Sequence, residues 1–178
     1  FSTENWNRPK FEVNALMDLL VYSLENERVN LIENGIKLNV IGELETLKDK
    51  AKTKLKSIIS ETKSNKKLNL NLAISYGSKQ EIVNVIREIS NKVKNNIISS
   101  KNIDENIINE HLYTRNLPNV DLLIRTGGEK RISNFLLWQI AYAEMYFTDL
   151  LWPDFKKEDF IDALDDYQKR DRRFGKIN

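Results

Sequence analysis

The segment LNLNLAISYG, residues 68–77, alternates strictly between apolar and polar residues and closes on a tyrosine and a glycine. Because successive side chains of a strand point to opposite faces, this pattern predicts a β-strand. Shorter apolar runs predict further strands within 36–42, 120–128 and 145–155. Helical spacing of apolar residues predicts helices over 9–34, 44–63, 80–93, 104–113, 133–144 and 156–173. Alternating strands and helices predict an α/β fold, in which a mostly parallel central sheet is flanked by helices.

The composition excludes several classes of protein. The chain has 178 residues, so we expect one domain over 1–178. The net charge is only +2, which argues against a nucleic-acid partner. Cysteine is absent, so disulfides and thiolate metal sites are excluded, as fits a reducing compartment. No apolar run reaches the roughly 18 residues that span a bilayer, and we expect a cytoplasmic protein.

Two arginines and a glycine pair precede a predicted apolar helix. Arg125 ends a predicted strand, and Arg131 and Ser133 follow the glycines. Guanidinium groups and a hydroxyl at a helix N-terminus supply fixed donors and a favourable dipole for a phosphate or diphosphate. Alternatively, the arginines pair structurally with Glu129 and Asp121. These two interpretations are about equally good on physical grounds alone.

A second group of polar residues lies at the start of the chain. Trp6 could cover an apolar ligand and Arg8 could meet another anion, with Ser2 and Asn5 beside them. The simpler interpretation of Trp6, a core anchor, is favoured. The only histidine, His111, lies in a polar helix without acidic or serine partners, which argues against a catalytic triad. Neither GxxxxGK[ST] nor GxGxxG occurs, so both nucleotide-binding fingerprints are absent.

The stretches FSTENWNRP, RTGGEKRISNFLLWQIAYAEMYF and LWPDF resemble motifs of the cis-prenyltransferases, and most closely of the bacterial undecaprenyl diphosphate synthases. The resemblance extends from Phe1 to about Gly175. It implies repeated cis-condensation of isopentenyl diphosphate onto farnesyl diphosphate, with release of diphosphate and a requirement for Mg²⁺. The product would be a polyprenyl diphosphate for the cell-wall lipid carrier, released through a peripheral contact with a membrane.

The resemblance also implies roles for the cationic residues. Arg125, Arg131 and Ser133 match the cradle for the isopentenyl diphosphate head group, and Glu129 would orient the arginines. Arg8 matches a diphosphate contact near the allylic substrate. Fixed cations in such positions offset charge on the departing diphosphate.

Further roles follow from the same motifs. Ser2, Asn5 and Trp6 match a mobile loop that closes the site, with Asn5 as the catalytic candidate within this chain. Glu144 matches an acidic residue associated with magnesium.

The growing chain of such an enzyme needs an apolar tunnel. The resemblance places Leu16, Met17 and Leu20 of the first helix along it and Leu68 near its floor. A plain packed core would show the same periodicity, so the residues alone leave both interpretations open.

The C-terminal RDRRFG resembles the family's Arg-x-Gly element, here Arg173 and Gly175, which reaches towards the site across a homodimer. Two departures stand out. Lys130 occupies a position where some relatives carry a metal-binding histidine, and Ser78 and Lys79 replace the commoner glycine-arginine pair.

Relatives begin with a strand and an Asp-Gly-Asn-Gly-Arg segment that carries the metal-binding catalytic aspartate. The 178 residues do not contain this segment, so we expect them to show little prenyl transfer alone. One alternative is a non-catalytic subunit that partners an active cis-prenyltransferase, although the retained arginines argue against it. The other is a diphosphate-binding module, which gives no reason for the broad apolar face of the first helix.

Overall fold

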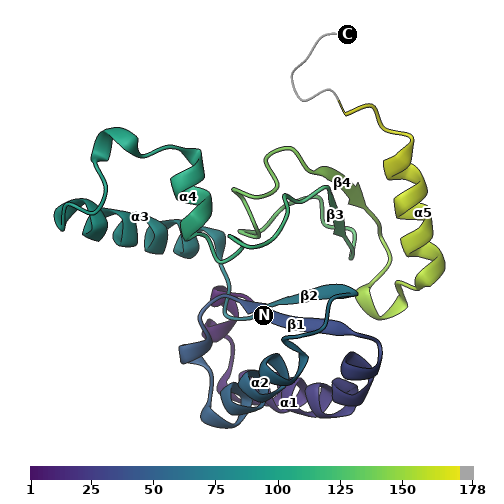
Figure 1. Ribbon diagram of the computed structural model, residues 1–178. Helices are drawn as coiled ribbons and strands as arrows, with labels where there is room; N and C mark the ends of the chain where they lie inside the picture. Colours follow the sequence, from purple (N-terminus) through teal and green to yellow (C-terminus); the bar gives the residue numbers. More distant parts are fainter. Residues whose placement is uncertain (173–178) are drawn as a thin grey trace. The chain divides into compact units, whose positions relative to one another are not determined.

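The computed structural model describes residues 1–172, which fall into two compact units divided after Arg115. The first unit holds β1 and β2 with α1 to α4, and the second holds β3, β4 and α5 (Figure 1). The α/β class is confirmed. Among the described residues the strands form two separate parallel pairs, one in each unit, where the sequence predicted one central sheet. Periodicity identifies a strand but not its neighbour, so the sequence could not specify the pairing.

In the first unit, two helices cover a parallel strand pair. β1 (Ile36–Ile41) pairs with β2 (Leu68–Ala73), with Ile36 opposite Leu68 and Ile41 opposite Ala73. Figure 1 shows α1 (Lys10–Glu33) and α2 (Asp49–Thr62) together on one side of this pair. α2 begins later than predicted, because a short 3-10 helix, η2 (Leu44–Thr46), and a turn occupy the residues before it.

The core of this unit lies between the helices and the strands. The buried residues of α1 recur at intervals of three or four along most of the helix, which places them on one face. The central cluster consists of Met17, Leu24, Leu31, Leu38, Leu47, Leu55, Ile58 and Ile74. The hydroxyl of Thr62 donates to the Ile58 carbonyl at 2.8 Å and accepts from the Leu38 amide at 3.1 Å, so it ties α2 to β1.

Two glycines shape the ends of these elements. Gly35 terminates α1 with a positive φ of 67°, as is usual directly after a helix. Gly42 follows β1 with φ of 116°, and a Cβ atom there would lie 2.1 Å from the Ile74 carbonyl oxygen. Only glycine allows the backbone to pass so close to β2.

The remainder of the first unit is helical. Thr3–Asn7 forms a 3-10 helix, η1, and α3 (Ser78–Lys94) follows β2 after the four residues 74–77. After another 3-10 turn, η3 (Ser100–Asn102), the amide of Ile107 donates to Asp104 Oδ1 at 2.9 Å and caps α4 (Glu105–His111). The sequence predicted both helices and this cap.

In the second unit, β3 (Leu122–Arg125) pairs in parallel with β4 (Glu144–Phe147). A 3-10 turn, η4 (Trp152–Asp154), leads into α5 (Lys157–Gln168). No helix within residues 1–172 is both long enough and apolar enough to cross a membrane.

The predicted helix over 133–144 is wrong, because turns occupy residues 133–142 and β4 begins at Glu144. Ser133, Asn134 and Leu136 have positive φ values of 53°, 62° and 49°, which an α-helix cannot accommodate. The Ile140 amide donates to the Leu136 carbonyl at 3.0 Å, four residues back as in an α-helix.

Candidate functional site

Arg125 ends β3 and carries a buried donor without a partner. Its carbonyl accepts from the Thr148 amide at 3.0 Å, which fixes the residue beside the end of β4. Its side-chain Nε is buried, and no acceptor in residues 1–172 reaches it. A buried unpaired N–H of a charged group is costly, so an anionic oxygen at this point would remove a penalty as well as add a contact.

Arg131 is paired within its own loop. Its Nη1 lies 2.5 Å from Glu129 Oε2, and both side chains are about half exposed. Asp121 is engaged by Arg172 at 2.7 Å. Of the structural ion pairs that the sequence offered as an alternative, the structure shows the one between Arg131 and Glu129. An exposed pair of this kind is weak, which leaves Arg131 available to a stronger anion.

Ser133 does not stand at a helix N-terminus, because residues 133–142 are turns. The predicted contribution of a helix dipole to anion binding is therefore wrong for this loop. What remains for an anion is a hydroxyl and two guanidinium groups on the segment that connects β3 to β4.

The glycine pair of this loop has two different roles. The Gly127 amide donates to the Leu150 carbonyl at 2.7 Å, and the Gly128 amide donates to the Thr148 carbonyl at 3.0 Å. Both amides therefore hold the loop against the segment after β4. A Cβ at Gly128 would lie 3.3 Å from Asp149 Oδ1, whereas one at Gly127 would meet nothing within 4 Å. The space at Gly127 leaves room for a ligand to approach the backbone.

The N-terminal group lies in the first unit, where it extends the strand pair. Ser2 forms a parallel bridge with Tyr76, and the Thr3 amide donates to the Tyr76 carbonyl at 3.1 Å. Asn5 uses its Oδ1 to accept from the Ser2 amide at 2.8 Å. The structure thus brings Ser2 and Asn5 together, with Asn5 closing the turn.

Trp6 packs against the core cluster, and its ring meets that of Phe1 edge-on at 4.9 Å. Its Nε1 donates to the hydroxyl of Ser75 at 2.8 Å. Trp6 is only partly buried, so one part of its ring contacts the core and the rest remains accessible. Arg8 is exposed and lies 4.0 Å from Glu12 on the next turn, so its guanidinium remains accessible.

Glu144 opens β4, and an arginine holds its carboxylate. Arg170 Nη1 donates to Glu144 Oε2 at 2.9 Å. Within residues 1–172 no three acidic, histidine or cysteine side chains gather as a metal site would require. Magnesium prefers near-octahedral oxygen ligands, so the described residues do not by themselves form a site that fits it.

The four predicted tunnel residues occupy different environments. Met17 is buried in the core cluster and Leu20 packs against it. Leu16 is 37% exposed and Leu68 is 57% exposed. In the first unit, therefore, Met17 and Leu20 pack in the core, and Leu68 lies at the exposed start of β2.

Sequence reasoning missed a buried carboxylate. Glu81 is 1% exposed, accepts from the Tyr76 hydroxyl at 2.6 Å and accepts from the Tyr113 amide at 2.7 Å. It stands in the first turn of α3, which Ser78 and Lys79 open. Only its place after a tyrosine-glycine turn could have drawn attention to it.

The C-terminal element and the only histidine of the chain remain. Arg173 and Gly175 lie outside the described residues. The ring nitrogens of His111 lie 2.6 Å from Lys92 Nζ and 2.6 Å from the Ile107 carbonyl, so the ring bridges α3 and its own helix.

Comparison with known proteins matches residues 1–175 to a family profile described as "Putative undecaprenyl diphosphate synthase". An isoprenyl transferase of Porphyromonas gingivalis is 48% identical over 178 residues, which cover all of this chain and 70% of that protein. A ditrans,polycis-undecaprenyl-diphosphate synthase of Escherichia coli, specific for (2E,6E)-farnesyl diphosphate, is 46% identical over 175 residues, or 98% of this chain and 69% of that protein.

Two solved structures are also similar. Lavandulyl diphosphate synthase from Lavandula x intermedia, in complex with dimethylallyl diphosphate, has a TM-score of 0.95 and 36% identity, covering 99% of this chain and 76% of that one. A probable undecaprenyl diphosphate synthase from Campylobacter jejuni has a TM-score of 0.86 and 38% identity, covering 99% and 80%.

Proposed function

Since this chain belongs to the undecaprenyl diphosphate synthase family of cis-prenyltransferases, we propose that it elongates farnesyl diphosphate with isopentenyl diphosphate. Membership of the family makes it a transferase of prenyl groups. The proposed product is undecaprenyl diphosphate, for the lipid carrier of cell-wall synthesis. The names of the relatives support this choice of substrate and product.

Each round of the proposed reaction forms one bond between carbons. The allylic C1–O bond breaks and diphosphate leaves with the electron pair, while the terminal carbon of isopentenyl diphosphate bonds to C1. Loss of a proton from C2 of the isopentenyl unit then creates the new double bond. Negative charge develops on the leaving diphosphate, so cationic side chains at that point lower the barrier.

The buried Nε of Arg125 is the observation that carries the site assignment. It requires an acceptor, and the loop that follows adds the guanidinium of Arg131 and the hydroxyl of Ser133. We assign these three groups to the diphosphate of isopentenyl diphosphate. Glu129 holds Arg131 while the anion is absent.

The allylic side is assigned to the N-terminal segment. The exposed guanidinium of Arg8 would contact the allylic diphosphate. Trp6 would present its ring to the hydrocarbon, and Ser2 and Asn5 form the turn that supports it. Asn5 is the catalytic candidate among these residues, through the amide group of its side chain.

Magnesium and a homodimer belong to the proposal through the family resemblance. Within residues 1–172 no group of acidic and histidine side chains could hold the metal by itself. The homodimer is testable directly by light scattering at micromolar concentration, where a monomeric mass would contradict it.

Incorporation of radiolabelled isopentenyl diphosphate into farnesyl diphosphate, with the full-length protein and magnesium, tests the function. We expect polyprenyl products with cis double bonds. Diphosphate binding without incorporation would instead identify a binding module. Incorporation that requires mixing with an active relative would identify a partner subunit.

A further inference from the structure

We propose that Ser75 is a positioning residue, which holds Trp6 and thereby the segment of Ser2 and Asn5 against the end of β2. Nothing in the motifs of this chain marks Ser75. The proposal rests on three features, namely its backbone conformation, its burial and a chain of hydrogen bonds.

The backbone at Ser75 is held in an uncommon conformation. Its φ is +50°, in the left-handed region that residues other than glycine seldom adopt, and the residue is 1% exposed. Its carbonyl accepts from the Glu43 amide at 3.3 Å, which fixes it beside the turn after β1. Such a conformation costs free energy and persists where surrounding contacts enforce it.

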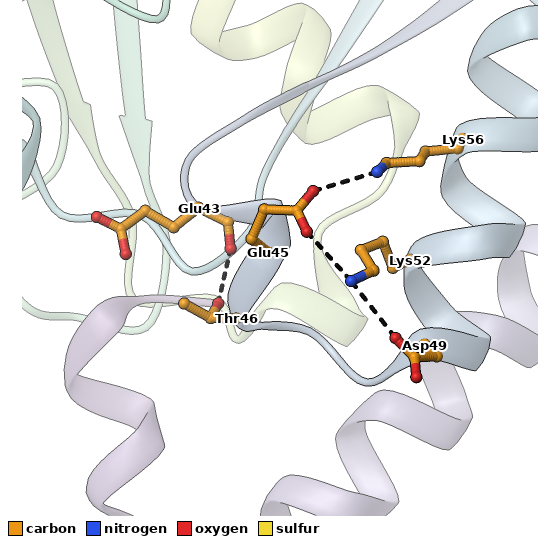
Figure 2. A network of polar contacts seen from close by, with 6 residues as sticks. All are labelled: Glu43, Glu45, Thr46, Asp49, Lys52 and Lys56. Atoms are coloured by element: carbon orange, nitrogen blue, oxygen red, sulfur yellow. Dashed lines mark hydrogen bonds and ion pairs between the residues drawn. The ribbon is translucent and has the colours of Figure 1, made fainter.

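The side chain of Ser75 joins two loops. Its Oγ accepts from Trp6 Nε1 at 2.8 Å and lies 2.9 Å from Thr46 Oγ1. The hydroxyl of Thr46 donates to the Glu43 carbonyl at 2.6 Å, a contact drawn in Figure 2.

The number of hydrogens sets the direction of this chain. Each hydroxyl has one hydrogen, and a carbonyl oxygen can only accept. Because Thr46 donates to Glu43, the hydroxyl of Ser75 must donate to Thr46, and the lone pairs of Ser75 remain for the indole. Three hydrogen bonds therefore run in one direction, from Trp6 through Ser75 and Thr46 to Glu43, and such bonds polarise one another.

These three hydrogen bonds, from Trp6 through Ser75 and Thr46 to Glu43, form a relay that completes the anchoring of the N-terminal segment. Backbone bonds to Tyr76 hold residues 1–3, and Asn5 closes the turn onto Ser2. Only the relay fixes the indole of Trp6 by its polar edge. Loss of the Ser75 hydroxyl should therefore release the indole while residues 1–3 remain paired.

Exchange of the Trp6 indole N–H with water, followed by NMR, tests the relay. A Trp6→Phe variant assigns the signal. Ser75→Gly removes the hydroxyl but permits the positive φ, so it separates the hydrogen bond from backbone strain. We expect exchange to accelerate by about threefold to tenfold, the range for loss of one neutral hydrogen bond. Thr46→Val, which keeps the acceptor at Ser75, should give a smaller increase.

An unchanged exchange rate in a folded Ser75→Gly protein would overturn the proposal. Ser75→Ala should exchange at least as fast, because it lacks the hydroxyl and strains the backbone. If the Trp6 indole N–H exchanged as slowly in a folded Ser75→Ala protein as in the unchanged protein, the proposal would also be contradicted.

The kinetic consequence rests on the proposed function and needs a separate measurement. In the full-length protein, Ser75→Gly should raise the KM for farnesyl diphosphate more than that for isopentenyl diphosphate. When Ser75→Gly is combined with Trp6→Phe, the KM for farnesyl diphosphate should rise little beyond its value in Trp6→Phe alone, because both changes remove the same contact. Fully additive effects would contradict positioning through Trp6, whereas failure of the proposed function would leave the NMR result intact.

Discussion

Arg170 donates to Glu144 at 2.9 Å and to the Met145 carbonyl at 3.0 Å, and its other terminal nitrogen contacts Asp166. One guanidinium thus fastens the residues after α5 to the start of β4. The Glu144 carboxylate, followed by that of Asp166, raises the pKa of Arg170. The acidic residue assigned to magnesium by resemblance is therefore a structural partner of an arginine in this fold.

Glu144→Gln should loosen this attachment, because the amide keeps the shape but loses the charge. We expect faster amide hydrogen exchange over 166–172, by a factor that corresponds to about 0.2–1 kcal/mol for a partly exposed pair. Asp165→Asn, which neutralises an exposed acid of α5 next to Asp166, is the matched control. Equal exchange in both variants would show that the pair contributes nothing measurable.

Arg125→Ala and Arg131→Ala should weaken binding of isopentenyl diphosphate. Loss of one charge-assisted contact should cost about 1.5–3 kcal/mol, and Arg125 should cost more, because the Glu129 pair must first open around Arg131. Calorimetric titration with isopentenyl diphosphate measures this. Lys157→Ala, on α5 in the same unit, controls for loss of charge. Binding unaffected in both arginine variants would remove the cradle assignment.

Leu68→Ala should change stability little but product length noticeably. A buried leucine would cost about 2–5 kcal/mol on truncation, but Leu68 is 57% exposed, so we expect about 0.5 kcal/mol or less. Leu55→Ala, at a fully buried position, should show the full cost in urea denaturation.

If Leu68 lies at the tunnel floor, its truncation should let longer chains form. Chromatography of radiolabelled products from the full-length variant would reveal them. Products of the original length would show that Leu68 does not form the floor of the tunnel.

Tyr113 should make stability fall at alkaline pH. Burial is the main cause that raises its pKa above the usual 10, with nearby carboxylates adding to it and the hydrogen bond from Asn84 opposing it. The unfolded chain therefore loses this proton at lower pH than the folded chain. The contribution is fully present below about pH 10 and is lost as pH rises through the folded pKa. Urea denaturation between pH 9 and 11 should show a flatter decline for Tyr113→Phe.

A network of exposed charges between η2 and α2 should affect stability in the opposite, acidic pH range. Glu45 accepts hydrogen bonds from Lys52 and Lys56 at 3.1 Å each. These two contacts, drawn in Figure 2, lower the pKa of Glu45. Stability from this source is present above the unfolded pKa and is lost as pH falls through the folded value. We expect Glu45→Gln to remove a small, salt-sensitive part of the acid dependence, whereas an identical acid profile for the variant would contradict it.

Elements with a clear period could be predicted from the sequence. The long helix α1, the strands β1 and β2 and the capped helix α4 lie where their apolar spacing and caps indicate. Periodicity failed over 133–144, because left-handed residues at Ser133, Asn134 and Leu136 leave no mark in a sequence without glycine or proline.

The sequence predicted which residue types form the candidate site, but not how their side chains are arranged. Residue types indicated that Arg125 and Arg131 could bind an anion, but not that Glu129 already holds Arg131. Ser75 and Arg170 could not be found, because their partners are 69 and 26 residues away along the chain. Only the fold brings them together.

The close approach at Gly42 bears on how mutational scans of this family are interpreted. Any side chain there must push against the Ile74 carbonyl, with no flexible neighbour to yield. Variants at this codon should therefore be eliminated in a growth selection as thoroughly as variants of the arginines. Intolerance to substitution would reflect the crowding of two main-chain segments, and a ranking of positions by sensitivity alone would mistake a packing constraint for a catalytic role.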